Sequence, residues 1–365
     1  MESRMLKVKE KKTTPISSNL IRGVVNASHD LRCSLIKRLD VEKPLADTSA
    51  SSLVERLESY HGYIESLSAL EGPMFTVSLQ RCGLESLSFT WHDAFKKHRN
   101  PFNFWKSNKE TQTSIQFEKA AVFFNYAAIY SQMGAAADWS SMAGIRKACD
   151  AFQSSAGAFK FLKEHVLDTD VVLWESMDLS PECVEVLEKL MLAQAEECFF
   201  ELAVQTNKSP KGCSKVARRV GLCYQTAYEA FNTSPPHIKR HLGKAWASHL
   251  QLKASLFYAR ACYHYSLKLH DDKEIGEEIA RLRIGITTLS DIAKRTPKRV
   301  ASSLIGVASG LKKIMISKLE AANKENSLIY CMRVPTESSL TDLPVGCSLA
   351  SSKPIKDLIT NPMEY

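Results

Sequence analysis

Residues 180–205 read Ser-Pro-Glu-Cys-Val-Glu-Val-Leu-Glu-Lys-Leu-Met-Leu-Ala-Gln-Ala-Glu-Glu-Cys-Phe-Phe-Glu-Leu-Ala-Val-Gln. Apolar side chains recur every three or four residues along this segment, as they do on the buried face of an α-helix. The serine, proline and glutamate at its beginning are typical of a helix start. The segment therefore predicts one long amphipathic helix. Its buried face consists of Val184, Leu187, Met191, Ala195, Cys198 and Leu202.

Four more segments show the same helical repeat of apolar residues. They run from Ile145 to Leu162, from Cys213 to Phe231, from Leu250 to Tyr265 and from Ile275 to Leu289. The second of them should end at Pro235 and Pro236, because proline breaks the helical hydrogen-bond ladder. Long amphipathic helices with short connections predict a mainly α fold, built as an array of antiparallel helices.

The first hundred residues have a different pattern. Phe75–Leu79 and Leu87–Trp91 alternate with period two and are strand candidates. We expect one folded domain over residues 1–340, with a small strand-containing part over about 1–95 and a helical body over about 110–330. An extended tail rich in serine and proline should follow over residues 341–365. The segment Lys96–Lys109 contains three aromatic residues, and we expect it to form a surface loop.

The composition is typical of a folded globular domain, with 44% hydrophobic and 24% charged residues. The net charge of +8 favours weak peripheral contact with anionic membranes. No nucleic-acid motif accompanies this charge, so we expect no nucleic-acid partner. The charged segment Met1–Lys12 lacks the apolar core of a signal peptide, and the sequence has no apolar run long enough to span a bilayer.

No cofactor or metal motif is found in the sequence. Its ten cysteines include no Cys-x-x-Cys pair, which predicts free thiols in a reducing compartment. His237 and His241 are four residues apart without the glutamate of a metalloprotease motif, and we expect both to be exposed at a helix start. A glycine-rich phosphate loop and a Gly-x-Ser-x-Gly elbow are also missing, so the expected cofactors and metals are none.

One enzyme alternative comes from Cys213–Arg219, which matches the bare Cys-x5-Arg pattern of tyrosine phosphatases. That chemistry needs a thiolate in a loop whose backbone N–H groups and arginine surround a phosphate. Here the segment continues a helical repeat, on which Arg219 points about 120° away from Cys213. The pattern therefore favours a protein without enzymatic activity, with the cysteine-dependent phosphatase as the alternative.

Six strings in the chain, in this order, resemble the Bro-type domain of the ALIX/rhophilin family, and the last of them is most similar to the plant ALIX branch. They are Phe89–Phe95, Glu118–Asn125, Ser155–Phe159, Met191–Phe200, Gly276–Leu282 and Lys324–Pro335. The resemblance implies a curved array of helix pairs similar to tetratricopeptide repeats, with a small N-terminal sheet. ALIX-like proteins continue into further segments, so we expect either a Bro-only chain or part of a longer relative.

The resemblance also implies a binding groove for a partner helix. Its residues would be Phe199, Gly212 and Val216, with the basic Arg146 beside them. A large aliphatic residue of the animal proteins is matched by Gly212, so the groove should lack one apolar anchor, for which Cys213 or Val216 could compensate. Lys215 belongs to a predicted basic stripe that would form the rim of the groove, together with Lys211, Arg218 and Arg219.

The implied function is that of a cytoplasmic adaptor recruited to endosomes. Its expected partner is the C-terminal amphipathic helix of an ESCRT-III subunit in multivesicular body sorting. A generic helical-repeat scaffold is the other alternative, because two-faced helices are normal in such arrays.

Overall fold

A computed structural model describes residues 12–13, 29–42, 49–68, 70, 87–95, 109–167, 176–295 and 302–355. The predicted strand Phe75–Leu79 and the loop aromatics Phe102, Phe104 and Trp105 lie outside these residues.

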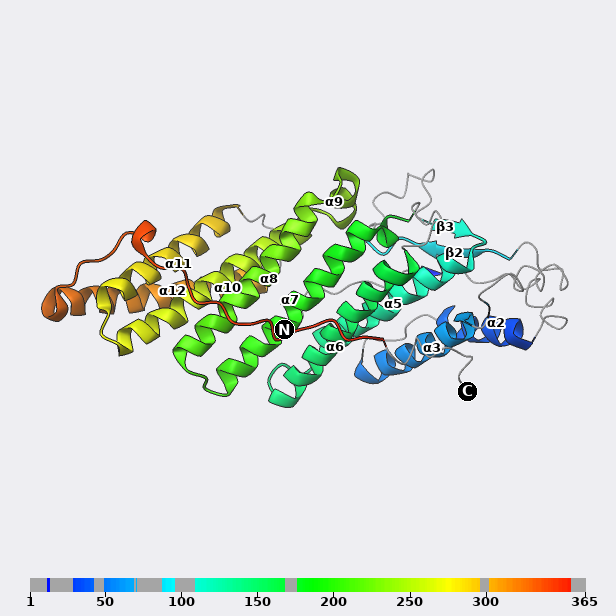
Figure 1. Cartoon of the computed structure of the whole chain (residues 1–365), viewed down its shortest axis with the longest axis horizontal. Helices are drawn as coiled ribbons and strands as arrows, with labels where there is room; N and C mark the ends of the chain where they lie inside the picture. The colour runs from blue at the N-terminus through cyan, green and yellow to red at the C-terminus, as the bar shows by residue number, and fades with distance from the viewer. Residues whose placement is uncertain are drawn as a thin grey trace.

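Helices arranged side by side make up most of the described chain (Figure 1). Along the array, α5 packs on α6, α6 on α7, α7 on α8, α8 on α10, α10 on α11, and α11 on α12. This confirms the predicted mainly α array. The bounds are α2 His29–Glu42, α3 Ala50–Ser68, α5 Ile115–Ala136, α6 Met142–Phe161, α7 Pro181–Gln205, α8 Pro210–Thr233, α9 Pro236–Leu242, α10 Lys244–Asp271, α11 Ile275–Arg295 and α12 Ser302–Glu325.

Serine side chains cap the helices that form the middle of the array. The Cys183 backbone N–H donates to Ser180 Oγ at 3.2 Å, and Pro181 occupies the first turn of α7. The same arrangement starts α8, where the Gly212 N–H donates to Ser209 Oγ at 3.2 Å. Serine caps satisfy backbone donors that the first helical turn leaves free, and proline needs no such partner there.

A three-stranded antiparallel sheet lies at the N-terminal end of the array (Figure 1). Its strand order is β1 (Lys12–Thr13), β2 (Phe89–His92), β3 (Lys109–Gln112), and Trp91 is opposite both Thr13 and Glu110. The strand predicted over Leu87–Trp91 is thus confirmed as β2. Phe89 and Trp91 are buried, as expected for alternate residues of a strand with one covered face.

A buried carboxylate joins this N-terminal part to the helical body. Glu118 on α5 accepts hydrogen bonds from Arg38 of α2, from the Tyr63 hydroxyl of α3 at 2.9 Å, and from Trp91 Nε1 of β2 at 2.5 Å. Burial raises the pKa of Glu118, and the nearby Arg38 guanidinium opposes that effect. One side chain therefore fixes two helices and a strand on α5.

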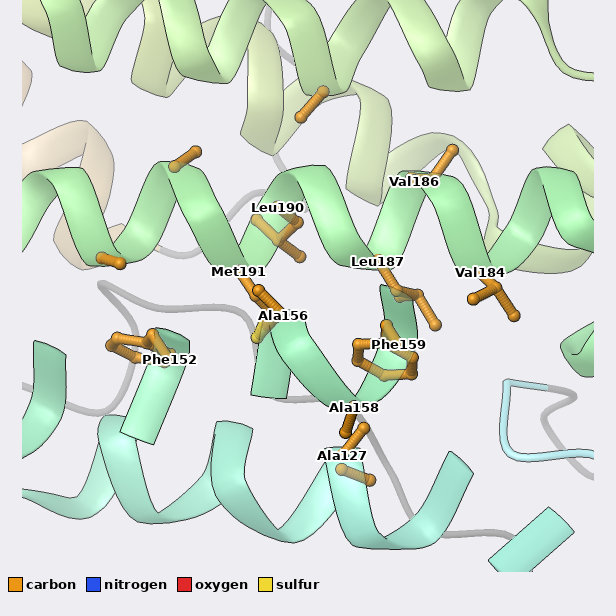
Figure 2. Packing of buried hydrophobic residues seen from close by; sticks show 14 of the residues in the cluster. Ala127, Phe152, Ala156, Ala158, Phe159, Val184, Val186, Leu187, Leu190 and Met191 are labelled. Carbon is orange, nitrogen blue, oxygen red and sulfur yellow. The ribbon is translucent and has the colours of Figure 1, made fainter. Parts of the chain in front are cut away.

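The core between α5, α6 and α7 combines bulky residues with alanines (Figure 2). Figure 2 shows Val184 and Leu187 pointing from α7 toward Phe159 of α6, while Val186 points to the opposite side. Ala127 and Ala158 meet between α5 and α6, where small side chains let the backbones approach closely. Each inner helix is therefore buried on two faces.

After α12 the chain forms two short helical turns, Asn326–Tyr330 and Glu337–Ser339, and the tail that follows returns across the array in an extended conformation, drawn red in Figure 1. Its backbone contacts include the Gly346 N–H to the Lys215 carbonyl on α8 and the Lys353 N–H to the Gln153 carbonyl on α6, both at 3.1 Å. A β-carbon at Gly157 would lie 1.8 Å from the Lys353 carbonyl oxygen, so this close approach requires glycine. Residues 341–355 thus lie on the helical body, and the domain boundary at residue 340 stays a prediction.

Candidate partner-binding groove

A pocket of about 290 Å³ opens on the surface where α7 ends and α8 begins. It contains Phe199 and Val216, two of the residues that the family resemblance implies for a groove on these two helices. The tail closes one side of the pocket with Leu349. The remaining lining residues are Leu202, Ala203, Thr206 and Lys208.

The two neighbouring phenylalanines of α7 have different environments. Phe200 is 3% exposed, because its ring packs edge-to-face on Phe257 of α10 at 5.4 Å and lies under the Arg260 guanidinium at 5.0 Å. Phe199 is only half-buried and faces the pocket. The second layer of helices therefore accounts for Phe200 and leaves Phe199 accessible to a partner.

Gly212 and Cys213 lie beside the pocket without lining it. A β-carbon at Gly212 would be 3.0 Å from Lys208 Cγ, so this glycine lies directly behind a lining residue. The buried Cys213 thiol points at the Lys208 carbonyl oxygen at 3.3 Å and at the Ala203 carbonyl oxygen at 3.9 Å. Their role in the groove stays a prediction.

Lys215 and Arg146 are placed near the tail. Lys215 is half-buried on α8, and its carbonyl accepts the Gly346 N–H. Arg146 is exposed on α6, one turn before Asp150, whose carboxylate pairs with Lys353 of the tail at 2.9 Å. Residues four apart share a helix face, so Arg146 lies on the face of α6 that the tail reaches. Partner contact at both residues stays a prediction.

Sequence reasoning missed two kinds of lining residue. Lys208 lines the pocket just after the last turn of α7, and it was not predicted because it belongs to no helical repeat of apolar residues. Leu349 is more than 130 positions from Val216 in the sequence, and no periodicity predicts where an extended segment docks. Leu349 is one of several apolar side chains in the tail, and the sequence does not indicate which of them contacts the helices.

Comparisons with known proteins identify the family. The sequence pattern of the BRO1-like domain matches residues 5–364. The chain belongs to the BRO1-like domain family. It is 37% identical to Vacuolar-sorting protein BRO1 of Arabidopsis thaliana over 356 residues, which are 94% of this chain and 40% of that protein. It is 32% identical to human Programmed cell death 6-interacting protein over 324 residues, which are 88% of this chain and 34% of that protein.

A solved structure supports the same assignment. The chain is similar to the BRO1 domain in the ALIX BRO1 CHMP4C complex, with a TM-score of 0.77 and 26% identity, over 98% of each chain. This BRO1-like domain spans 40% or less of the length of the two curated relatives named above. Among its described residues, no helix is long and apolar enough to cross a membrane.

The predicted basic stripe on α8 of this BRO1-like domain is not continuous. Arg218 lies over the Tyr258 ring of α10 at 5.1 Å, whereas Arg219 Nε lies 3.9 Å from Glu196 of α7. The stripe is interrupted because α8 packs between α7 and α10, and the two arginines turn toward opposite neighbours. A role of Lys211 and Lys215 at the rim of the groove stays a prediction.

The Cys-x5-Arg match of this BRO1-like domain lies on an unbroken helix. Cys213 is near the start of α8, and burial raises the pKa of its thiol. Arg219 reaches toward Glu196 on α7, while Cys213 points at the end of α7 near Lys208. Thiolate chemistry needs a depressed pKa and a phosphate-binding loop, and this arrangement has the opposite properties.

One cluster of possible metal ligands occurs within the described part of the chain: Asp93, Asp178 and His241. Asp178 accepts the Ala94 N–H at 2.6 Å and pairs with His241 Nε2. His241 is 7% exposed, so the prediction of an exposed histidine was wrong. Its ring is buried because α9 packs against α7 and brings it to Asp178. The Asp178–His241 pair links α9 to the segment before α7, and the expected absence of a metal stays a prediction.

Proposed function

We propose that this BRO1-like domain is a non-catalytic adaptor that binds the C-terminal amphipathic helix of an ESCRT-III subunit. The observation that carries the proposal is the half-buried ring of Phe199 in a pocket with Val216 and Leu349. An aromatic side chain in an apolar pocket is the usual anchor for a partner helix laid in a groove. The similar BRO1 domain in the ALIX BRO1 CHMP4C complex supports this choice of partner.

The charges at the groove select the chemistry of the bound helix. Lys208 lines the pocket, and Lys211 is exposed one turn away on α8. The bound helix should therefore present an apolar stripe to Phe199 and acidic residues to these lysines. Such charges contribute to orientation and association rate more than to affinity.

The cellular role follows from the relatives. One of them is named as a vacuolar-sorting protein, and we infer that this chain acts in the cytoplasm and is recruited to endosomes during multivesicular body sorting. Absence of catalysis is part of the proposal, because the Cys213 thiol is buried with a raised pKa. Slow labelling of Cys213 by thiol reagents at neutral pH and background phosphatase activity are the expected results, and rapid labelling with turnover lost in Cys213→Ser would contradict them.

Calorimetric titration of the whole chain tests the proposed partner. Peptides from the C-terminal helices of each ESCRT-III subunit of the source organism are the ligands, and at least one should bind. The matched control is the same peptide with its apolar stripe changed to serine, which should not bind. Absence of binding by every subunit's helix would contradict the proposal.

A further inference from the structure

A single buried carboxylate on α7 holds the tail beside the groove. Glu196 Oε1 accepts hydrogen bonds from Ser348 Oγ at 2.8 Å, from the Leu349 N–H at 2.8 Å and from the Ala350 N–H at 3.1 Å. Glu196 is 1% exposed. We call these three hydrogen bonds the tail clasp. Bonds of backbone N–H groups to a carboxylate are stronger than bonds between neutral groups, so the clasp fixes the tail at these residues.

The tail clasp determines where the Leu349 side chain lies. In an extended segment, neighbouring side chains point to opposite faces. Ala350 is buried against the helices, while Leu349 is 42% exposed and lines the pocket. Since the backbone N–H groups of both residues bind Glu196, the carboxylate sets the position and direction of Leu349.

The same region of α7 carries the tail clasp and the anchor of the groove. Glu196 precedes Phe199 by three residues, which places both on one side of the helix. Arg219 of α8 lies 3.9 Å from the Glu196 carboxylate and compensates part of its buried charge. The second carboxylate oxygen of Glu196 has no hydrogen-bond partner. The hydrogen bonds that this buried carboxylate accepts therefore all come from the tail.

We propose that Glu196 is a positioning residue for partner binding: its carboxylate holds residues 348–350 so that Leu349 forms the tail wall of the groove. This inference rests on the proposed function, because the wall matters only to a ligand in the groove. It makes the groove a composite of α7, α8 and a distant tail segment. Glu196 itself need not touch the bound helix.

The test is a double-mutant cycle for the best-binding ESCRT-III helix peptide. Glu196→Ala and Leu349→Ala should each weaken binding by about tenfold, the loss of one apolar contact in an interface. In the Leu349→Ala background, Glu196→Ala should cause no further loss, because both changes remove the same wall. Glu196→Gln keeps an acceptor oxygen and should restore most of the affinity.

The control separates positioning from stability. Glu188 is a second buried glutamate of α7 and pairs with Lys163 at 2.8 Å, away from the tail. Glu188→Ala should lower the melting temperature yet leave peptide affinity unchanged. Wild-type affinity in a folded Glu196→Ala variant, or a further tenfold loss in the double variant, would overturn the inference.

Hydrogen exchange without peptide tests the tail clasp independently of any partner. The amides of Leu349 and Ala350 should exchange faster in Glu196→Ala than in wild type, and unchanged exchange would overturn the clasp. If wild type binds no helix peptide, the proposed function fails, whereas the exchange measurement still decides whether Glu196 holds the tail.

Discussion

Phe199 and Phe200 differ by 100° around α7, and this rotation decides their roles. Phe200 fills a space against α10, where truncation would leave a cavity. Phe199 meets solvent at the pocket, where truncation would remove the proposed anchor for a ligand. At the residue scale, burial therefore separates a structural aromatic residue from the one that we propose binds a partner.

His249 gives a residue-scale prediction about pH. Burial, helped by the positive charge of Lys253, lowers the pKa of His249 to about 3. An unfolded histidine has a pKa near 6.5, so the unfolded chain gains a proton below that pH that the folded chain does not take up until about pH 3. The free energy of unfolding should therefore fall as the pH drops through this window, by about 2 kcal/mol between pH 7 and 5 from this residue. Urea denaturation of His249→Leu should show a correspondingly smaller fall, and an identical pH dependence would contradict the assignment.

Gly212 gives a second prediction at this scale. Gly212→Ile should tighten binding of the partner helix by about 1–2 kcal/mol, because it adds apolar surface behind Lys208 at the groove. The β-carbon would lie 3.0 Å from Lys208 Cγ and 3.2 Å from Ser209 Oγ, so both side chains must shift slightly. Gly306→Ile on α12 is the control, because a β-carbon at Gly306 would meet no atom within 4 Å. Unchanged affinity in a folded Gly212→Ile variant would show that the groove does not extend to the start of α8.

At the scale of elements, the buried Glu118 links the N-terminal part to the helical array. Glu118→Ala should destabilise the domain by about 3–5 kcal/mol, because it removes the buried ion pair with Arg38 and the hydrogen bonds from Tyr63 and Trp91. Chemical denaturation measures this loss. Adding Arg38→Met, which keeps apolar contact with Phe89, should recover part of the stability. A double variant as unstable as Glu118→Ala would mean that loss of the Arg38–Glu118 ion pair is not the cause.

The helices could be predicted from the sequence because each buried face repeats locally. All five predicted helical segments lie within α6, α7, α8, α10 and α11, apart from Leu162, the residue after α6. Phe199 and Val216 could be placed in one groove through the family resemblance and the helical wheel. The wheel could not tell that Phe200 meets α10, because a second helix layer and a partner leave the same pattern. Leu349 and the direction of Arg219 depend on contacts between distant segments, which no local pattern contains.

At the scale of the whole molecule, the net charge of +8 predicts weak binding to anionic membranes. Binding to anionic liposomes should fall steeply between 0.1 and 1 M salt, since the Debye length shortens from about 10 Å to about 3 Å. Changing Lys211 and Lys215 to glutamate should weaken liposome binding. Arg218 is left unchanged in this test, because it packs on the Tyr258 ring and its loss would affect the stability of the domain. Liposome co-sedimentation measures the effect. Binding that salt does not reduce would contradict electrostatic contact and direct attention to the aromatic residues at 102, 104 and 105.

The central claim is that a helix binds this domain through the groove beside Phe199. The most direct test is calorimetric titration of wild type and Phe199→Ala with the best-binding ESCRT-III C-terminal helix. Leu328→Ala is the control, because Leu328 is an exposed apolar residue outside the pocket. Phe199→Ala should weaken binding by at least about 2 kcal/mol without unfolding the domain. Leu328→Ala should bind the helix with wild-type affinity. Equal affinity of wild type and Phe199→Ala would contradict the account.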